Sequence, residues 1–179
     1  YQNFEITPWF YIYFVENNGM AYGIELGSKL FLSLSRIVIV GAFIYYLYRW
    51  IKRNYSTGFI MCFSLIIAGA LGNIIDSIFY GRIFTDSFGK VATMFPEGGG
   101  YAPFFHGRVV DMLYFPLFSF EWPSWVPVVG GEEFLFFRPI FNIADSAVTV
   151  GFALFLIFYR NQFNGEKKNE AVSQNKNDE

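Results

Sequence analysis

Residues 69–77 read G-A-L-G-N-I-I-D-S, and they close an apolar segment that covers about residues 58–79. Two other apolar segments, at about 30–50 and 140–160, have a similar length. Each holds roughly 20 mostly apolar residues, which is enough for a helix to cross a hydrocarbon core about 30 Å thick. The chain is 54% hydrophobic and only 16% charged, more apolar than most soluble domains. The sequence therefore predicts an integral membrane protein that is mainly α, built as a helical bundle with three spans.

The short connection between the first two spans indicates how the bundle is oriented. It is basic and has no acid nearby, with Arg49, Lys52 and Arg53. Short basic loops lie on the cytoplasmic side of a membrane. We therefore expect residues 1–29 and 80–139 on the extracytoplasmic side. An extracytoplasmic start without a signal sequence predicts one earlier span outside this sequence, hence four spans in the full-length protein.

The segments between the spans have different compositions. Residues 4–15 are rich in β-branched and aromatic residues and predict short strands interrupted at Pro8. Residues 80–139 are rich in proline and aromatic residues, and we expect an irregular outer loop that acts as a lid. The polar tail, residues 161–179, lacks apolar periodicity and is predicted to be disordered on the cytoplasmic side. One membrane domain, residues 1–160, thus holds every candidate functional residue.

Three aspartates are candidates for chemistry at the outer ends of the spans. Asp76 closes the second span, Asp145 opens the last one, and Asp111 lies in an apolar part of the outer loop that can return to the same depth. Acids at membrane depth are costly and are usually functional. Two adjacent carboxyl groups share a proton, so one acts as base and the other as acid, as in aspartic proteases. For any one aspartate taken alone, a helix cap is the better interpretation.

Three asparagines accompany these acids: Asn17, Asn73 and Asn142. A carboxamide can hold a peptide backbone or orient a carboxyl group without adding charge. Helix capping explains an asparagine equally well, above all for Asn142, which lies three positions before Asp145. Both interpretations stay open at the level of the sequence.

Composition also argues against other classes of protein. The net charge of −2 and the lack of a basic stripe disfavour nucleic-acid binding. A single His106, a single Cys62 and no H-E-x-x-H pattern disfavour a zinc site, and we expect no metal and no cofactor. No G-x-S-x-G turn indicates a serine nucleophile.

Four short motifs, in order, resemble those of the lipoprotein signal peptidases (type II signal peptidases). N-N-G-M-A-Y-G at 17–23 resembles their N-x-G-x-A-F element, and G-N-I-I-D at 72–76 resembles G-N-x-x-D-R. G-R-V-V-D at 107–111 and F-N-I-A-D-S at 141–146 complete the set. Each motif is weakly specific alone, but their order and membrane placement make the resemblance strong over residues 11–160.

The resemblance implies an intramembrane aspartic endopeptidase with Asp111 and Asp145 as the catalytic pair. Its substrates would be prolipoproteins, cut on the amino side of a cysteine that carries diacylglycerol. It also implies a small extracytoplasmic β-cradle, an active site at the outer face of a bacterial cytoplasmic (inner) membrane, contact with membrane lipids, and action as a monomer. The residues expected to bind substrate or support the site are Asn17, Gly19, Asn73, Asp76, Arg108 and Asn142.

The sequence departs from the family pattern at two places. Ser77 stands where the family has arginine, so Arg82 or Arg108 is a candidate to replace that cation. The stretch between 78 and 107 is an insertion that could form an extra lid or a partner surface. Arg36, inside the first apolar segment, is expected either to pair with an acid of the outer layer or to extend toward water.

Two functions of other classes remain as alternatives. A small transporter or channel subunit would use Asp76, Asp145 and Arg36 along an ion path, but it does not explain Asp111. A non-catalytic membrane scaffold would bind a partner through its aromatic outer loop, but it does not explain the order of the motifs.

Overall fold

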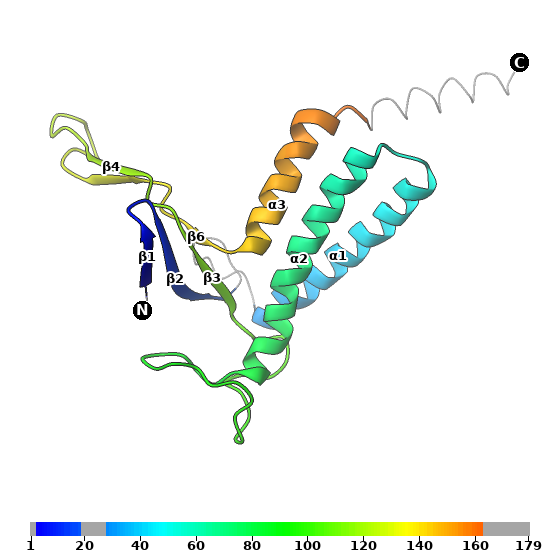
Figure 1. Cartoon of the computed structure of the whole chain (residues 1–179), viewed down its shortest axis with the longest axis horizontal. Helices are drawn as coiled ribbons and strands as arrows, with labels where there is room; N and C mark the ends of the chain where they lie inside the picture. Colours follow the sequence, from blue (N-terminus) through cyan, green and yellow to red (C-terminus); the bar gives the residue numbers. More distant parts are fainter. Residues whose placement is uncertain (1–2, 19–27, 163–179) are drawn as a thin grey trace, which may run out of the picture.

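A computed structural model describes residues 3–18 and 28–162 of the chain. Figure 1 shows the helices gathered in one half of the molecule and the strands in the other, with the helices side by side. The predicted tail at 161–179 lies almost wholly outside the described residues, as does Gly19.

The helical half consists of α1 (Lys29–Lys52), α2 (Thr57–Ile83) and α3 (Ile143–Leu154), which continues as the π-helical turn η2 (Phe155–Tyr159). Serine side chains cap the first two helices: Ser28 accepts from the Phe31 amide and Ser56 from the Phe59 amide. Within the described residues, α1 and α2 are the helices long and apolar enough to cross a membrane. Both cover their predicted spans and extend beyond them.

The last helix begins later than predicted. Residues 140–141 belong to a strand, and Asn142 caps the helix, so the predicted span of 140–160 is wrong at its start. The helix and its π-turn have twelve and five residues, which gives a length of about 25 Å. This segment is short for a span, and its passage across the whole membrane stays a prediction.

Helix α2 lies between the other two helices and packs on both. Val40 of α1 and Ile67 and Ile74 of α2 form the buried apolar cluster on one side. On the other side α3 approaches Gly69 so closely that an added methyl group would overlap the Ala144 carbonyl oxygen. Glycine at this position therefore allows the two helices to touch through their backbones.

The strand half contains an antiparallel sheet in the order β1-β2-β3-β6. The first two strands, joined at Pro8, agree with the expected extended segments at 4–15. Strand β3 corrects the sequence analysis, which placed its residues in an irregular loop. The strand bounds are β1 (Asn3–Thr7), β2 (Phe10–Asn17), β3 (Val109–Tyr114) and β6 (Ile140–Phe141).

The rest of the segment predicted as an outer loop is also more regular than expected. Helix α2 continues to Ile83, so the irregular part of the stretch between 78 and 107, here called the inserted loop, starts at 84. Residues 84–108 fold back on the end of α2 through backbone hydrogen bonds, such as Ala102 to Gly81 at 2.9 Å. A separate two-stranded hairpin, β4 (Phe118–Glu121) and β5 (Glu133–Phe136), follows β3.

Candidate active site

Strand pairing fixes the position of Asp111. In β3 it faces Val15 of β2, and the alternation of the strand turns its side chain away from its neighbours Val110 and Met112. Only 5% of Asp111 is exposed. Asn17, at the end of β2, donates through Nδ2 to Asp111 Oδ2 at 3.1 Å. The sheet thereby carries both a buried carboxyl group and an amide that holds it.

Asp145 is fixed by the start of α3. Asn142 accepts a hydrogen bond from the Asp145 amide through Oδ1 at 2.9 Å, and Asp145 Oδ2 accepts one from the Asn142 amide at 3.2 Å. This reciprocal pair is a capping box, which satisfies two amide groups that the first turn leaves without helical partners. The capping interpretation of Asn142 is therefore confirmed.

The same asparagine also joins the two acids. Asn142 Nδ2 donates to Asp111 Oδ1 at 2.9 Å and to Asn73 Oδ1 at 3.1 Å. Asn73 Nδ2 in turn donates to Asp145 Oδ1 at 2.8 Å. The structure thus brings together acids that are distant in sequence, through two amides, Asn142 at the cap of α3 and Asn73 of α2. Asn142 therefore caps α3 through Oδ1 and bridges Asp111 and Asn73 through Nδ2.

The electrostatics of the site favour the protonated form of Asp111. Burial raises the pKa of Asp111 above its ordinary value, and the charge of Asp145 raises it further. Hydrogen bonds from Asn17 and Asn142 lower this pKa and oppose part of the effect. Asp76 lies close enough for its charge to repel that of Asp111, and it interacts with the Tyr80 hydroxyl and the Val110 amide. All three predicted aspartates therefore meet at one end of the bundle.

The loop before β3 holds this strand against α2. Gly107 donates its amide to the Ser77 carbonyl at 2.9 Å, and an added methyl group there would overlap the Asp76 carbonyl oxygen. From α1, the Ser33 hydroxyl donates to the Phe105 carbonyl at 2.8 Å. Only glycine permits this approach at 107, so the glycine of G-R-V-V-D sets the position of the acid four residues later.

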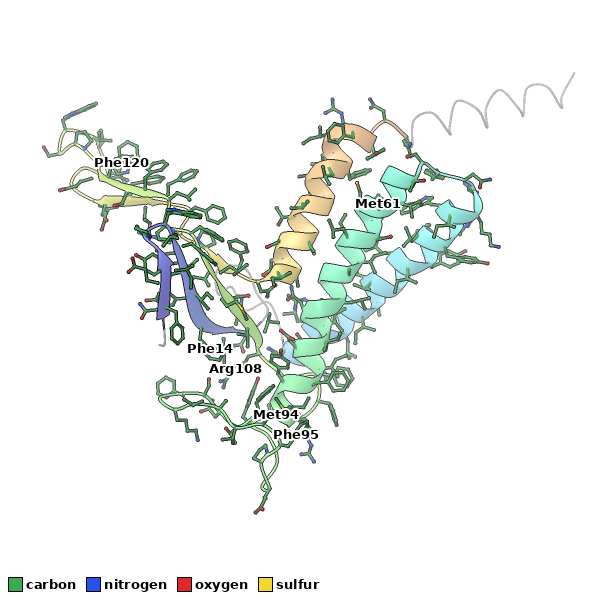
Figure 2. All side chains as sticks on the ribbon, in the orientation of Figure 1. Phe14, Met61, Met94, Phe95, Arg108 and Phe120 are labelled. Carbon is green, nitrogen blue, oxygen red and sulfur yellow. The ribbon has the colours of Figure 1, made fainter. Side chains whose placement is uncertain are left out.

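Arg108 connects the inserted loop to strand β2. Its Nη1 forms ion pairs with Glu16 at 2.7 Å and with Asp86 at 2.9 Å, and its guanidinium lies 4.7 Å from the centre of the Tyr101 ring. Figure 2 shows Arg108 beside the sheet, above the inserted loop. Tyr101 and Glu16 were missed by the sequence analysis, because nothing in their local pattern links them to Arg108. A contact of Arg108 with substrate stays a prediction.

A different arginine lies near one of the candidate acids. Ser77 is 2% exposed and donates to the Asn73 carbonyl at 2.9 Å, so it supplies no cation. Arg82, one of the suggested replacements, lies in the last turn of α2, and its guanidinium is near Gly99. Arg36 of α1 instead lies close enough to Asp145 for their charges to attract. Two positions were expected for Arg36, and the structure has the one beside an acid of the outer layer.

No group of three or more histidine, cysteine or acidic side chains within residues 3–18 and 28–162 is arranged to hold a metal ion. The described site consists of carboxyl groups, amides and one nearby guanidinium.

Comparison with known proteins gives the family. A family model described as signal peptidase (SPase) II matches residues 1–160. The chain belongs to the signal peptidase II family. Lipoprotein signal peptidases of two Porphyromonas gingivalis strains are each 60% identical to it over 159 residues, which are 88% of this chain and 70% of theirs. The lipoprotein signal peptidase of Amoebophilus asiaticus is 37% identical over 153 residues, 83% of this chain and 61% of that protein.

Solved structures of bacterial membrane enzymes have a similar fold. A bacterial membrane enzyme matches 91% of this signal peptidase II chain and 74% of its own, with a TM-score of 0.55 and 26% identity. A second one has a TM-score of 0.54 and 28% identity, and covers 87% of this chain and 73% of its own. The predicted family is confirmed, and family and helices together make the chain a bacterial membrane protein.

Proposed function

We propose that this chain is an aspartic endopeptidase that removes signal peptides from prolipoproteins, with Asp111 and Asp145 as its catalytic pair. The observation that carries the proposal is the amide chain through Asn142 and Asn73, which joins two acids otherwise 34 positions apart in the sequence. The relatives named lipoprotein signal peptidase support the class of substrate. A transporter or a scaffold has no need for carboxyl groups held together in this way.

We assign the shared proton to Asp111, because burial and the neighbouring acid both raise its pKa. Asp145 then acts as the base. It takes a proton from water while the water oxygen bonds to the scissile carbonyl carbon, and Asp111 gives its proton to the carbonyl oxygen. In the second step, Asp145 passes its proton to the leaving amine, Asp111 recovers its own from the hydroxyl group, and the C–N bond breaks. Both acids end as they began.

The remaining residues would orient the pair and the substrate. Asn17 and Asn142 hold the two oxygens of Asp111 in place, and Asn73 holds Asp145. Arg36 lies close enough to Asp145 for their charges to attract, and it would help to hold the base in position. Asp76 would support the strand that carries Asp111 through its interaction with Val110.

The membrane placement of this site belongs to the same proposal. The acids lie at the end of the bundle opposite to the basic α1–α2 connection, so the positive-inside rule assigns them to the extracytoplasmic face of the cytoplasmic membrane. There, acyl chains of a diacylglyceryl cysteine can stay between lipids while the peptide reaches the acids, with cleavage on the amino side of that cysteine. The four-stranded sheet would be the extracytoplasmic cradle, and the enzyme would act as a monomer.

The test compares Asp111→Asn and Asp145→Asn with the unchanged protein on a lipidated precursor, by the mobility shift of the cleaved product on a gel. Each variant should remain folded in membranes and lose cleavage by at least about 100-fold, because each removes one partner of general acid–base catalysis. Glu97→Gln is the control, since Glu97 is an exposed acid of the inserted loop. Normal cleavage by either aspartate variant would refute the assignment.

A further inference from the structure

The β4–β5 hairpin has two chemically different faces. Its antiparallel register places Phe118 opposite Phe136 and Phe120 opposite Phe134, while Ser119 faces Leu135 and Glu121 faces Glu133. Side chains alternate between the two faces of a strand, so the phenylalanines share one face and the acids share the other. The rings contact one another in pairs: Phe118 stacks on Phe136 at 4.8 Å, and Phe120 lies tilted against Phe134 at 5.0 Å between centroids.

The tip of the hairpin extends the aromatic face. Residues 122–131 read W-P-S-W-V-P-V-V-G-G and contain no charged side chain. Trp122 packs on Phe120 at 5.0 Å, whereas Trp125 is 80% and Val128 96% exposed. The acids flank the tip: Glu121 ends β4, Glu133 begins β5, and Glu132 directly precedes β5.

The aromatic face is left largely exposed by the described residues. Strands β4 and β5 pack mainly against each other, and Phe118 remains 52% exposed. An isolated two-stranded hairpin is at best marginally stable in water, and it needs a further apolar surface on its hydrophobic face. Something outside the described chain must therefore cover these rings.

The position of the hairpin identifies that surface. Figure 1 shows the hairpin reaching outward from the sheet, away from α3 and across the direction of the helices, as an element that lies along a membrane surface would. In Figure 2, Phe120 lies well clear of the helices, on the far side of the sheet. Tryptophan and other aromatic residues concentrate where headgroups meet acyl chains, which is the depth at which α3 begins beside the sheet.

We propose that the aromatic face and uncharged tip of this hairpin insert into the outer leaflet at the boundary of headgroups and acyl chains. The occupant is phospholipid, and the acidic face remains in water. The hairpin then anchors the sheet beside the bundle at a fixed depth. The four-stranded sheet adds to this contact with lipid through Trp9, which lies between β1 and β2 and stacks on Phe115, the residue that follows β3. The proposal depends on the membrane placement given above, but not on proteolysis.

Spin labels on the two faces test the proposal in the full-length protein, reconstituted in phosphatidylcholine nanodiscs. Labels are attached to Phe120→Cys and Trp125→Cys, in a Cys62→Ala background, and their collisions with oxygen and with a water-soluble nickel chelate are compared. Both should favour oxygen, which concentrates in lipid. Ser119→Cys and Glu121→Cys, matched neighbours on the opposite face, should favour nickel.

Two results would overturn the anchor. Preference for nickel at Phe120→Cys and Trp125→Cys would place the aromatic face in water, and exclusion of both reagents would mean that a protein covers it. Fluorescence of this chain with Trp9→Phe and Trp50→Phe, which leave Trp122 and Trp125 of its four tryptophans, provides a check without labels. Brominated phosphatidylcholine should quench it and iodide should not. The inactive aspartate variants should give the same pattern, so failure of the anchor and failure of the proteolysis proposal are distinguishable.

Discussion

Substitutions of Asn142 can separate its two roles, because different atoms perform them. Oδ1 caps α3 through the Asp145 amide, and Nδ2 bridges Asp111 and Asn73. Serine caps a helix about as well as asparagine but has no amide to donate. Asn142→Ser should therefore keep the cap and lose the bridge, whereas Asn142→Ala should lose both.

The expected magnitudes follow from these bonds. Loss of the donor to Asp111 removes a largely buried hydrogen bond, worth about 1–3 kcal/mol, so kcat/KM should fall about 5- to 160-fold in both variants if the full loss falls on the transition state. Loss of the cap should make Asn142→Ala about 1 kcal/mol less stable than Asn142→Ser. The bond from Asn142 lowers the pKa of Asp111, so its loss raises that pKa. Because the proposed mechanism needs Asp111 protonated, the alkaline limb of the pH–rate profile should move to higher pH.

The assays are cleavage of a lipidated precursor across pH and thermal unfolding of the same preparations in detergent. Equal loss of activity with unequal stability is the expected pattern. If Asn142→Ser cleaves normally with an unchanged pH profile while Asn142→Ala fails, then Asn142 is a helix cap alone and the bridge has no catalytic part.

Three further substitutions probe the surroundings of the pair. Asp76→Asn should weaken cleavage but leave measurable turnover, since Asp76 acts on the strand that carries Asp111. Unchanged cleavage by this variant at every substrate concentration would mean that Asp76 has no role in the site. Arg36→Gln should lower kcat by about tenfold, the equivalent of about 1.4 kcal/mol, because Asp145 loses an attracting charge; Arg36→Lys should recover most of it, and equal loss in both would contradict a role of charge. Gly69→Ala should cost about 1–3 kcal/mol of stability in thermal unfolding, because its methyl group would overlap the Ala144 carbonyl oxygen; an unchanged Tm would mean that α3 shifts freely.

Much of the helical half could be predicted from hydropathy, because an apolar run of sufficient length has few alternatives to a helix in a membrane. The start of α3 could not be placed in this way. Ile140 and Phe141 are as apolar as the helix that follows, but they pair with β3, and Asn142 begins the helix after them. Hydropathy does not distinguish a short buried strand from the first turn of a span.

The sequence predicted that the three acids converge, but it did not predict the strand pairing that brings Asp111 to the other two. The segment Val109–Tyr114 looks like an apolar part of a loop, and only its pairing with β2 shows why Asp111 faces the bundle. Pairing between distant segments depends on register, which no local pattern encodes. The hairpin was missed for a related reason: prolines and glycines between 116 and 131 indicated an irregular lid, although they lie mostly in the loops that flank its two strands.

The cap of α3 also has a consequence for biosynthesis. Asp145 and Asn142 lie in the last described helix, close to the end of the matched region at 160, and both acquire their positions only when that helix winds and docks on α2. A chain still emerging from the ribosome thus carries Asp111 without its partner. Under the proposed mechanism, cleavage can begin only after α3 has been made and has docked on α2.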